Sequence, residues 1–152
     1  MVTESFTTNP WRLQKRVLPQ HTDHAGVMWH GAYVAWLEEA RVEALAAAGI
    51  PYDRVSEQGY EMPVVRMQIQ YRQALSHGDL VVLESFALPR RGVRWPWVSR
   101  FCLPDGSCAA EAEVELVLVQ FAEGKRAVAR DVPAPLAEAL SALLEGPVTR
   151  MQ

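Results

Sequence analysis

One long helix followed by a run of short strands is the feature that most constrains this fold. From about Ala32 to Ala48, apolar side chains recur at spacings of three and four, which is the period of a helix with one buried face. Gly49 favours the left-handed conformation that follows a helix, and Pro51 cannot continue one, so the helix is expected to end there. The other side of the helix is expected to face solvent, and it carries Glu38, Glu39, Arg41 and Glu43.

After this helix the period of the pattern changes to two, which indicates strands. A first strand is expected before the helix, at 12–20, and the later strands at 64–72, 80–88, 93–103, 109–121 and 125–130. Short turns at 76–79 and 104–106 join some of them and favour antiparallel pairing. A closing helix is expected over 133–144. This order predicts an α+β domain in which an antiparallel sheet buries the apolar face of the long helix.

One helix covers a sheet of this width only partly. The remaining face of the sheet, or one of its edges, is therefore expected to pair with a second subunit. The sequence predicts a homodimer or a homotetramer.

Length and charge limit the function classes. The 152 residues have the length of one domain, so 1–152 is interpreted as a single domain with its core at about 12–130. A net charge of −3 without a Lys/Arg-rich block argues against nucleic acid as a partner. No segment has the ~20 apolar residues of a membrane span, and the first ten residues do not resemble a signal peptide. A cytoplasmic protein with no membrane partner is expected.

The two cysteines, Cys102 and Cys108, flank a turn at 104–106 and could face each other across a hairpin. Without a secretory signal, reduced thiols are the expectation. Their spacing matches no common zinc pattern, and no pair of histidines completes one, so no metal site is predicted.

The loop before the long helix concentrates titratable groups. It holds His21, Asp23, His24 and His30. A helix start offers unpaired N–H groups and a partial positive charge, which would polarise a carbonyl group and stabilise an oxyanion. Asp23 could act there as a base for water or as a nucleophile. The same residue type is equally suited to capping a turn, and lone histidines are commonly surface or packing residues.

The residues around this loop resemble a known family. Residues 22–33 read TDHAGVMWHGAY, and 36–41 read WLEEAR. This pattern resembles the signature of the 4-hydroxybenzoyl-CoA thioesterase-like hotdog proteins, approximately T-D-x-x-G-x-x-[YF]-[HY]-x-x-Y followed by E-x-A-R. Residues 63–79, with Tyr71, Ala74 and the His77-Gly78-Asp79 turn, are similar to a second block of that family. The likeness extends over about 12–122.

The resemblance implies a hotdog fold: five to six antiparallel strands wrapped around one long central helix, with a short C-terminal helix. It implies hydrolysis of an acyl-CoA or acyl carrier protein thioester without a metal or organic cofactor. Asp23 corresponds to the catalytic carboxylate, and the backbone N–H groups of His30 and Gly31 would contact the thioester carbonyl. The His30 imidazole could orient the carboxylate or the water, while Trp29 and Tyr33 would contact substrate.

The binding site for the CoA phosphates is expected at residues 90–94, where similar proteins present basic side chains to these phosphates. Arg91 and Arg94 are the proposed ligands, because the guanidinium donates two parallel hydrogen bonds to phosphate. A solvated turn is the alternative for this segment, and a solvated strand face is expected for Glu111, Glu113 and Glu115. A non-catalytic acyl-CoA-binding protein and a hotdog hydratase or dehydratase stay open as functions, and the acyl group is left open.

Overall fold

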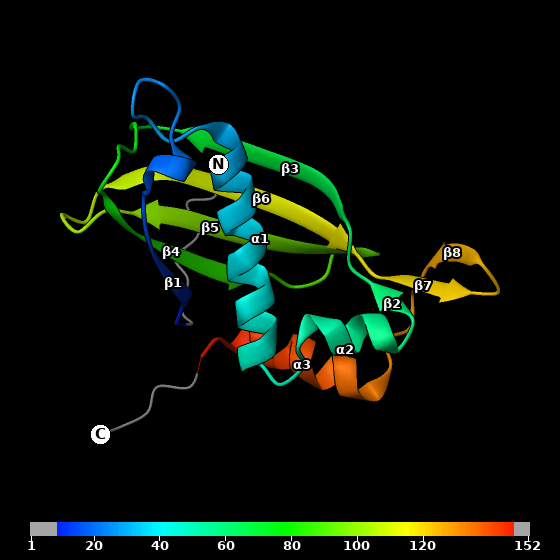
Figure 1. Cartoon of the computed structure of the whole chain (residues 1–152). Coiled ribbons are helices and arrows are strands. Elements are labelled where there is room, and N and C mark those ends of the chain that lie inside the picture. The colour runs from blue at the N-terminus through cyan, green and yellow to red at the C-terminus, as the bar shows by residue number, and fades with distance from the viewer. Residues whose placement is uncertain (1–8, 148–152) are drawn as a thin grey trace.

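The computed structural model describes residues 9–147 as an antiparallel sheet curved around one long helix, α1 (Figure 1). Within that range, none of the helices is long and apolar enough to cross a membrane. The expectation of no signal peptide falls largely on residues 1–8, which lie outside the described part. The elements are, in order, β1 (Trp11–Arg16), the 3-10 turn η1 (Pro19–His21), α1 (His30–Ala47), α2 (Tyr52–Glu57), β2 (Tyr60–Glu61), β3 (Val64–Tyr71), β4 (Leu80–Ala87), β5 (Arg94–Cys102), β6 (Cys108–Val117), β7 (Val119–Ala122), β8 (Lys125–Val128) and α3 (Ala134–Glu145).

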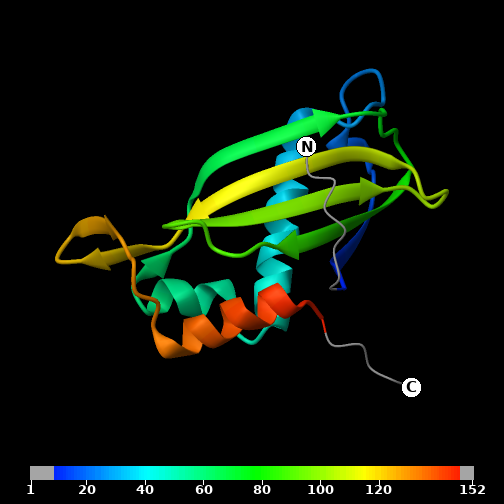
Figure 2. The same cartoon turned by 180° about the vertical axis from the view of Figure 1, so that it is seen from behind.

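The main sheet has the strand order β1-β4-β5-β6-β3, and every pairing is antiparallel. A small second sheet has the order β2-β7-β8. In Figure 1 it lies beside the end of the main sheet where β6 finishes, and Figure 2 shows the outer face of the main sheet from behind. The α+β class, the long helix and the C-terminal helix are confirmed.

The helix α1 buries one face on the sheet, as its period predicts. It begins at His30, two residues before the expected start, and ends at Ala47, with Gly49 in the left-handed region at a φ of +117°. The side chains of Trp36 and Leu37 are buried and belong to one core cluster with Phe101. Burying a side chain of this size contributes roughly 1.5–3 kcal/mol, so α1 is held mainly by its contact with the sheet.

The predicted pairing between the strands at 64–72 and 80–88 is wrong. Although 76–79 forms a turn, β3 and β4 lie at separate positions in the sheet, and β5 and β6 run between them. The connection between β3 and β4 also forms hydrogen bonds with the loop before α1. The Met28 N–H donates to the Leu75 carbonyl at 2.8 Å, and the His77 N–H donates to the Gly26 carbonyl at 3.1 Å. The link between β3 and β4 therefore supports the loop that bears Asp23.

The long strand expected at 109–121 is divided. β6 ends at Val117 and β7 starts at Val119 in the second sheet, with the fully buried Leu118 between them. The elements α2 and β2 were not predicted. Cys102 and Cys108 are register partners at the end of the β5–β6 hairpin, and both thiols are free.

Candidate active site

The loop between η1 and α1 is closed by backbone hydrogen bonds at both ends. The Asp23 N–H donates to the Val27 carbonyl at 2.8 Å, and the Trp29 N–H donates to the His21 carbonyl at 3.1 Å. Gly26 has a φ of +77°, which an L side chain rarely adopts, so glycine suits the tip of this turn. These bonds tie the loop that carries Asp23 back to Trp29, the residue that precedes α1.

Asp23 is an exposed carboxylate whose orientation is fixed. Its Oδ1 accepts the N–H of Ala25 at 2.8 Å and the N–H of Val27 at 3.2 Å. Both hydrogen bonds of the carboxylate found in residues 9–147 go to Oδ1, so Oδ2 is open to solvent or substrate. Asp23 thus does cap a turn, and this does not conflict with a chemical role, because one oxygen anchors the group while the other stays available.

The start of α1 carries amides that can receive an anion. Trp29 is the N-cap residue with an extended backbone, and no side chain of the described residues caps the first turn. The Ala32 N–H donates to the Trp29 carbonyl at 3.0 Å. The N–H groups of His30 and Gly31 precede the first intrahelical donor, and the helix end adds roughly half a positive charge.

Trp29, His30 and Gly31 form one cluster at this helix start. Trp29 is 47% exposed, and its indole packs over Gly31, where any Cβ would meet the ring. The His30 ring is exposed and lies 5.3 Å from the Trp29 ring, between centroids. Glycine at 31 therefore lets the tryptophan cover the first helical turn.

A hollow of about 330 Å³ lies next to this cluster and includes Tyr33. Tyr33 is nearly fully buried, and its ring meets the Tyr71 ring edge-on at 5.0 Å between centroids. Burial first, and the neighbouring Tyr71 second, raise the pKa of Tyr33, so it is a neutral phenol at physiological pH. The hollow is lined by Val27, Met28, Tyr33, Tyr71, Arg72, Gln73 and Ala74. Of these, the segment 71–74 was not predicted as part of the site, because only the folded position of the β3 end brings it there.

The other two histidines of the loop differ in role. His21 is structural: its Nδ1 accepts the Leu18 N–H at 3.0 Å, and its ring meets the Trp36 ring at 5.2 Å. His24 is exposed on the loop.

Arg91 and Arg94 lie at the opposite end of the sheet from Asp23. Arg94 pairs in register with Val117 at the end of β6, whereas the Asp23 loop contacts the segment that follows β3 (Figure 1). The eight residues of β3 separate the two ends, a distance of roughly 20–25 Å at ~3.3 Å per residue. One subunit therefore does not place these arginines beside the carboxylate.

Both arginines have acidic partners on β6. The Arg94 guanidinium forms a short ion pair with Glu115, and Arg91 Nη1 lies 3.9 Å from Glu113 Oε1. Glu115 is only 8% exposed and also faces Arg66 Nη1 at 3.7 Å. The prediction that these glutamates form a solvated face is wrong for Glu115, because arginines of the neighbouring strand and hairpin cover it.

Comparison with known proteins places this geometry in a family. The family model described as the Thioesterase-like superfamily matches residues 17–143. A protein of Synechocystis sp. named as a candidate esterase is 34% identical over 123 residues, 80% of this chain and 74% of that protein. The acyl-CoA thioester hydrolase YbgC of Escherichia coli is 27% identical over 114 residues, 75% of this chain and 85% of that protein. The crystal structure of a DHNA-CoA thioesterase from Staphylococcus aureus, 22% identical, has a TM-score of 0.76 and covers 86% of this chain and 87% of its own.

The chain has the hotdog fold and belongs to the Thioesterase-like superfamily. It is an enzyme of the thioesterase class, a hydrolase, as the resemblance of the 22–41 segment implied.

Proposed function

We propose that this enzyme hydrolyses an acyl-CoA thioester to a free acid and CoA, with Asp23 as the reacting carboxylate. One observation carries the proposal: the anchored, exposed carboxylate of Asp23 lies on a loop that is hydrogen-bonded back to the uncapped first turn of α1. The similarity to an acyl-CoA thioester hydrolase supports CoA as the thiol. An acyl carrier protein thioester offers the same reacting group and is the alternative substrate.

As a base, Asp23 takes a proton from water while the water oxygen attacks the thioester carbonyl carbon. The negative charge that forms on the carbonyl oxygen is stabilised by the N–H groups of His30 and Gly31, and the His30 imidazole orients the water. The C–S bond then breaks, and the CoA thiolate takes up the proton from Asp23. As a nucleophile, Asp23 would instead attack the thioester carbonyl carbon and expel the CoA thiolate, which leaves an anhydride between Asp23 and the acyl group. Water would then hydrolyse the anhydride to the free acid and the Asp23 carboxylate, and the thiolate would take up the proton that this step releases. Neither route uses a metal or an organic cofactor.

The substrate contacts follow from the same arrangement. Trp29 and the Tyr33 hollow lie beside the reacting groups and are proposed to hold the acyl group. Arg91 and Arg94 are proposed to bind the CoA phosphates at the far end of a long, extended substrate. The phosphates would then compete with Glu113 and Glu115 for the guanidinium groups. A cytoplasmic location is part of the proposal and can be tested by cell fractionation.

A homodimer is proposed through the edge strand β3. This strand ends the main sheet, and among the described strands it pairs only with β6. It exposes Val64, Val65 and Tyr71, an unusual number of large apolar groups for a free edge. Because Tyr71 also lines the Tyr33 hollow, a second copy on β3 would help to enclose the acyl group.

Asp23→Asn is the direct test. The amide oxygen of Asn can still accept the N–H groups of Ala25 and Val27, so the turn should persist while the negative charge is lost. Thiol release from a panel of acyl-CoA esters should show kcat lowered on the order of 10²–10⁴, the usual contribution of a general base. A folded Asn variant with wild-type turnover would remove Asp23 from the reaction.

Asp105→Asn is the matched control. Asp105 also anchors a turn, since its Oδ1 accepts the Ser107 N–H at 2.8 Å, but it lies in the β5–β6 hairpin. The same chemical change at this position should leave kcat unchanged. If both variants lose activity together, the loss reflects damage to turns and not the chemistry of Asp23.

A further inference from the structure

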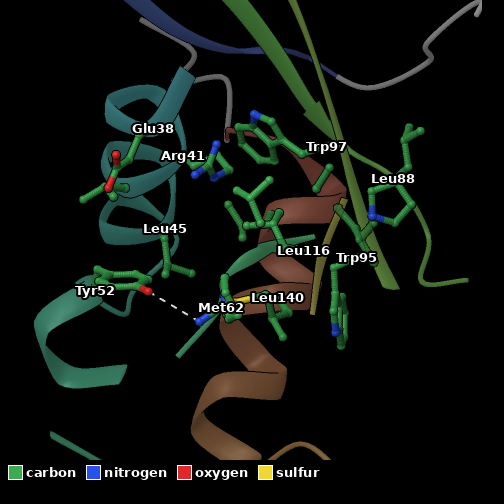
Figure 3. Close-up of a pocket in the computed structure, with 17 residues that line it drawn as sticks. Glu38, Arg41, Leu45, Tyr52, Met62, Leu88, Trp95, Trp97, Leu116 and Leu140 are labelled. Atoms are coloured by element: carbon green, nitrogen blue, oxygen red, sulfur yellow. Dashed lines mark hydrogen bonds between the residues drawn. The ribbon is translucent and has the colours of Figure 1, made fainter. Parts of the chain in front are cut away.

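A second cavity, of about 270 Å³, lies at the other end of α1 from Asp23 (Figure 3). It is enclosed by the C-terminal half of α1, the start of β5 and the helix α3. Most of its lining is apolar, including Leu45, Leu116 and Leu140. His30 and Arg41 are separated along α1 by roughly 16 Å at ~1.5 Å per residue. The cavity is therefore distinct from the hollow at Tyr33.

Arg41 introduces a positive charge into this apolar cavity. It was expected on the solvent side of α1, but it lines the cavity together with Glu38 and Trp97, and Figure 3 shows its guanidinium directed toward Trp97. Nη1 of Arg41 is buried and has no hydrogen-bond acceptor among the described residues. Burial lowers the pKa of the guanidinium, and the nearby Glu38 only partly opposes this, since no acid of residues 9–147 comes within ion-pair distance. The Arg41 side chain as a whole is partly exposed, so the cost of burying a polar group without a partner falls on this one nitrogen.

The other unsatisfied groups of the cavity are also donors. Nε1 of Trp95 and Nε1 of Trp97 are buried without an acceptor in the described part of the chain. The Tyr52 hydroxyl accepts the Met62 N–H at 3.4 Å, so its own O–H is free of that bond and can also donate. The lining thus presents one cation and two indole N–H groups, and none of the three unpartnered nitrogens has an acceptor among the described residues.

We propose that this cavity binds a small carboxylate with an apolar body, such as a medium-chain fatty acid. The carboxylate pairs with Arg41, because a planar guanidinium matches a carboxylate with two parallel hydrogen bonds. The hydrocarbon body packs among Leu45, Leu116 and Leu140. Among the described lining residues Arg41 is the one cationic side chain and Glu38 the one acidic side chain, which favours a monoanion over a phosphate dianion. The volume is below the roughly 300–1,000 Å³ of sites for drug-sized ligands, so a whole CoA ester does not fit.

Calorimetric titration of the full chain with octanoate, and separately with 1-octanol, tests the charge and the apolar body. The wild type should bind octanoate with a dissociation constant below about 1 mM, and more tightly than octanol. Arg41→Met should weaken octanoate binding about 10- to 100-fold, the effect of losing a hydrogen-bonded charge pair. Binding of octanol should change less than about three-fold. The variant should melt no lower than the wild type, since it removes a partly buried guanidinium that has no ion-pair partner among the described residues.

Three control variants test whether octanoate binds in this cavity through Arg41. Arg12→Met removes an exposed arginine that pairs with Glu84 at 3.2 Å, and it should leave octanoate binding intact. Ala87→Leu narrows the cavity without touching Arg41 and should weaken octanoate and octanol alike. Asp23→Asn should bind octanoate as the wild type does, which distinguishes this cavity from the proposed active site.

The proposal is overturned by any of three results. The first is no saturable binding of octanoate to the wild type. The second is equal loss of octanoate and octanol in Arg41→Met, or a lower melting temperature of that variant, which would make Arg41 a structural residue. The third is loss of octanoate binding in Asp23→Asn.

Discussion

Arg94→Ala perturbs both the outer face of the sheet and the proposed CoA site. In the wild type, Arg94 covers the carboxylate of Glu115, which is only 8% exposed and has Arg66 as a more distant partner at 3.7 Å. Removing Arg94 leaves this carboxylate largely desolvated and poorly paired. A buried group that loses its partner costs about 1–3 kcal/mol, which for ~150 residues lowers the melting temperature by about 2–12 °C.

The variant Arg94→Ala/Glu115→Gln separates stability from substrate binding. Removing the charge of Glu115 should restore much of the lost melting temperature, because no desolvated carboxylate then remains. It should not restore binding of the CoA phosphates. Loss of one exposed phosphate contact should raise the KM for an acyl-CoA about two- to five-fold, with kcat nearly unchanged, since the phosphates lie far from the reacting carbonyl. An N-acetylcysteamine thioester lacks the phosphates and should show no change.

Thermal unfolding followed by circular dichroism, together with thiol-release kinetics on both substrates, decides the outcome. Arg100→Ala is the matched control, because Arg100 lies on the same strand, is exposed and forms no ion pair with a described residue. An Arg94→Ala protein as stable as the wild type would refute the buried-pair argument. A KM raised equally for both thioesters would mean that Arg94 supports the fold and does not bind phosphate.

Two further predictions use other parts of the structure. Burial and the neighbouring Glu84 raise the pKa of Cys102 to about 12 from 9.0. At pH 8, iodoacetamide should therefore alkylate Cys102 on the order of 100–1,000 times more slowly in the folded than in the denatured protein. Alkylation at equal rates would contradict the burial of this thiol. Because the folded pKa is the higher one, this thiol should contribute stability below about pH 9 and lose it as the pH rises toward 12. Light scattering should give at least twice the chain mass of 17.0 kDa, and Val65→Lys on the β3 edge should increase the monomer fraction; a wild-type monomer at micromolar concentration would refute the dimer.

The sequence predicts where each helix and strand lies along the chain better than which strands pair with one another in the sheet. Periods of 3.6 and 2 report which face of an element is buried, and they identify α1 and the five strands of the main sheet to within a few residues. A period carries no information about which strand lies alongside, so the 76–79 turn was interpreted as a hairpin although β3 pairs with β6. The break at Leu118 was missed for a similar reason, since an apolar residue continues the alternation while the backbone changes sheets.

The same difference between contacts that are local and contacts that are distant in the sequence explains why the Asp23 site was predicted and the Arg41 cavity was not. Asp23, Trp29, His30, Gly31 and Tyr33 fall within eleven consecutive positions, so a motif brings them together through one loop and one helical turn. Arg41 lies on the same helix, and its charge predicted exposure. Its surroundings depend on α3, which lies about a hundred residues later in the chain and covers the end of α1. The cavity around Arg41 is completed only when that distant helix folds against α1. Because Nη1 of Arg41 has no hydrogen-bond acceptor among the described residues, a bound ligand can supply one.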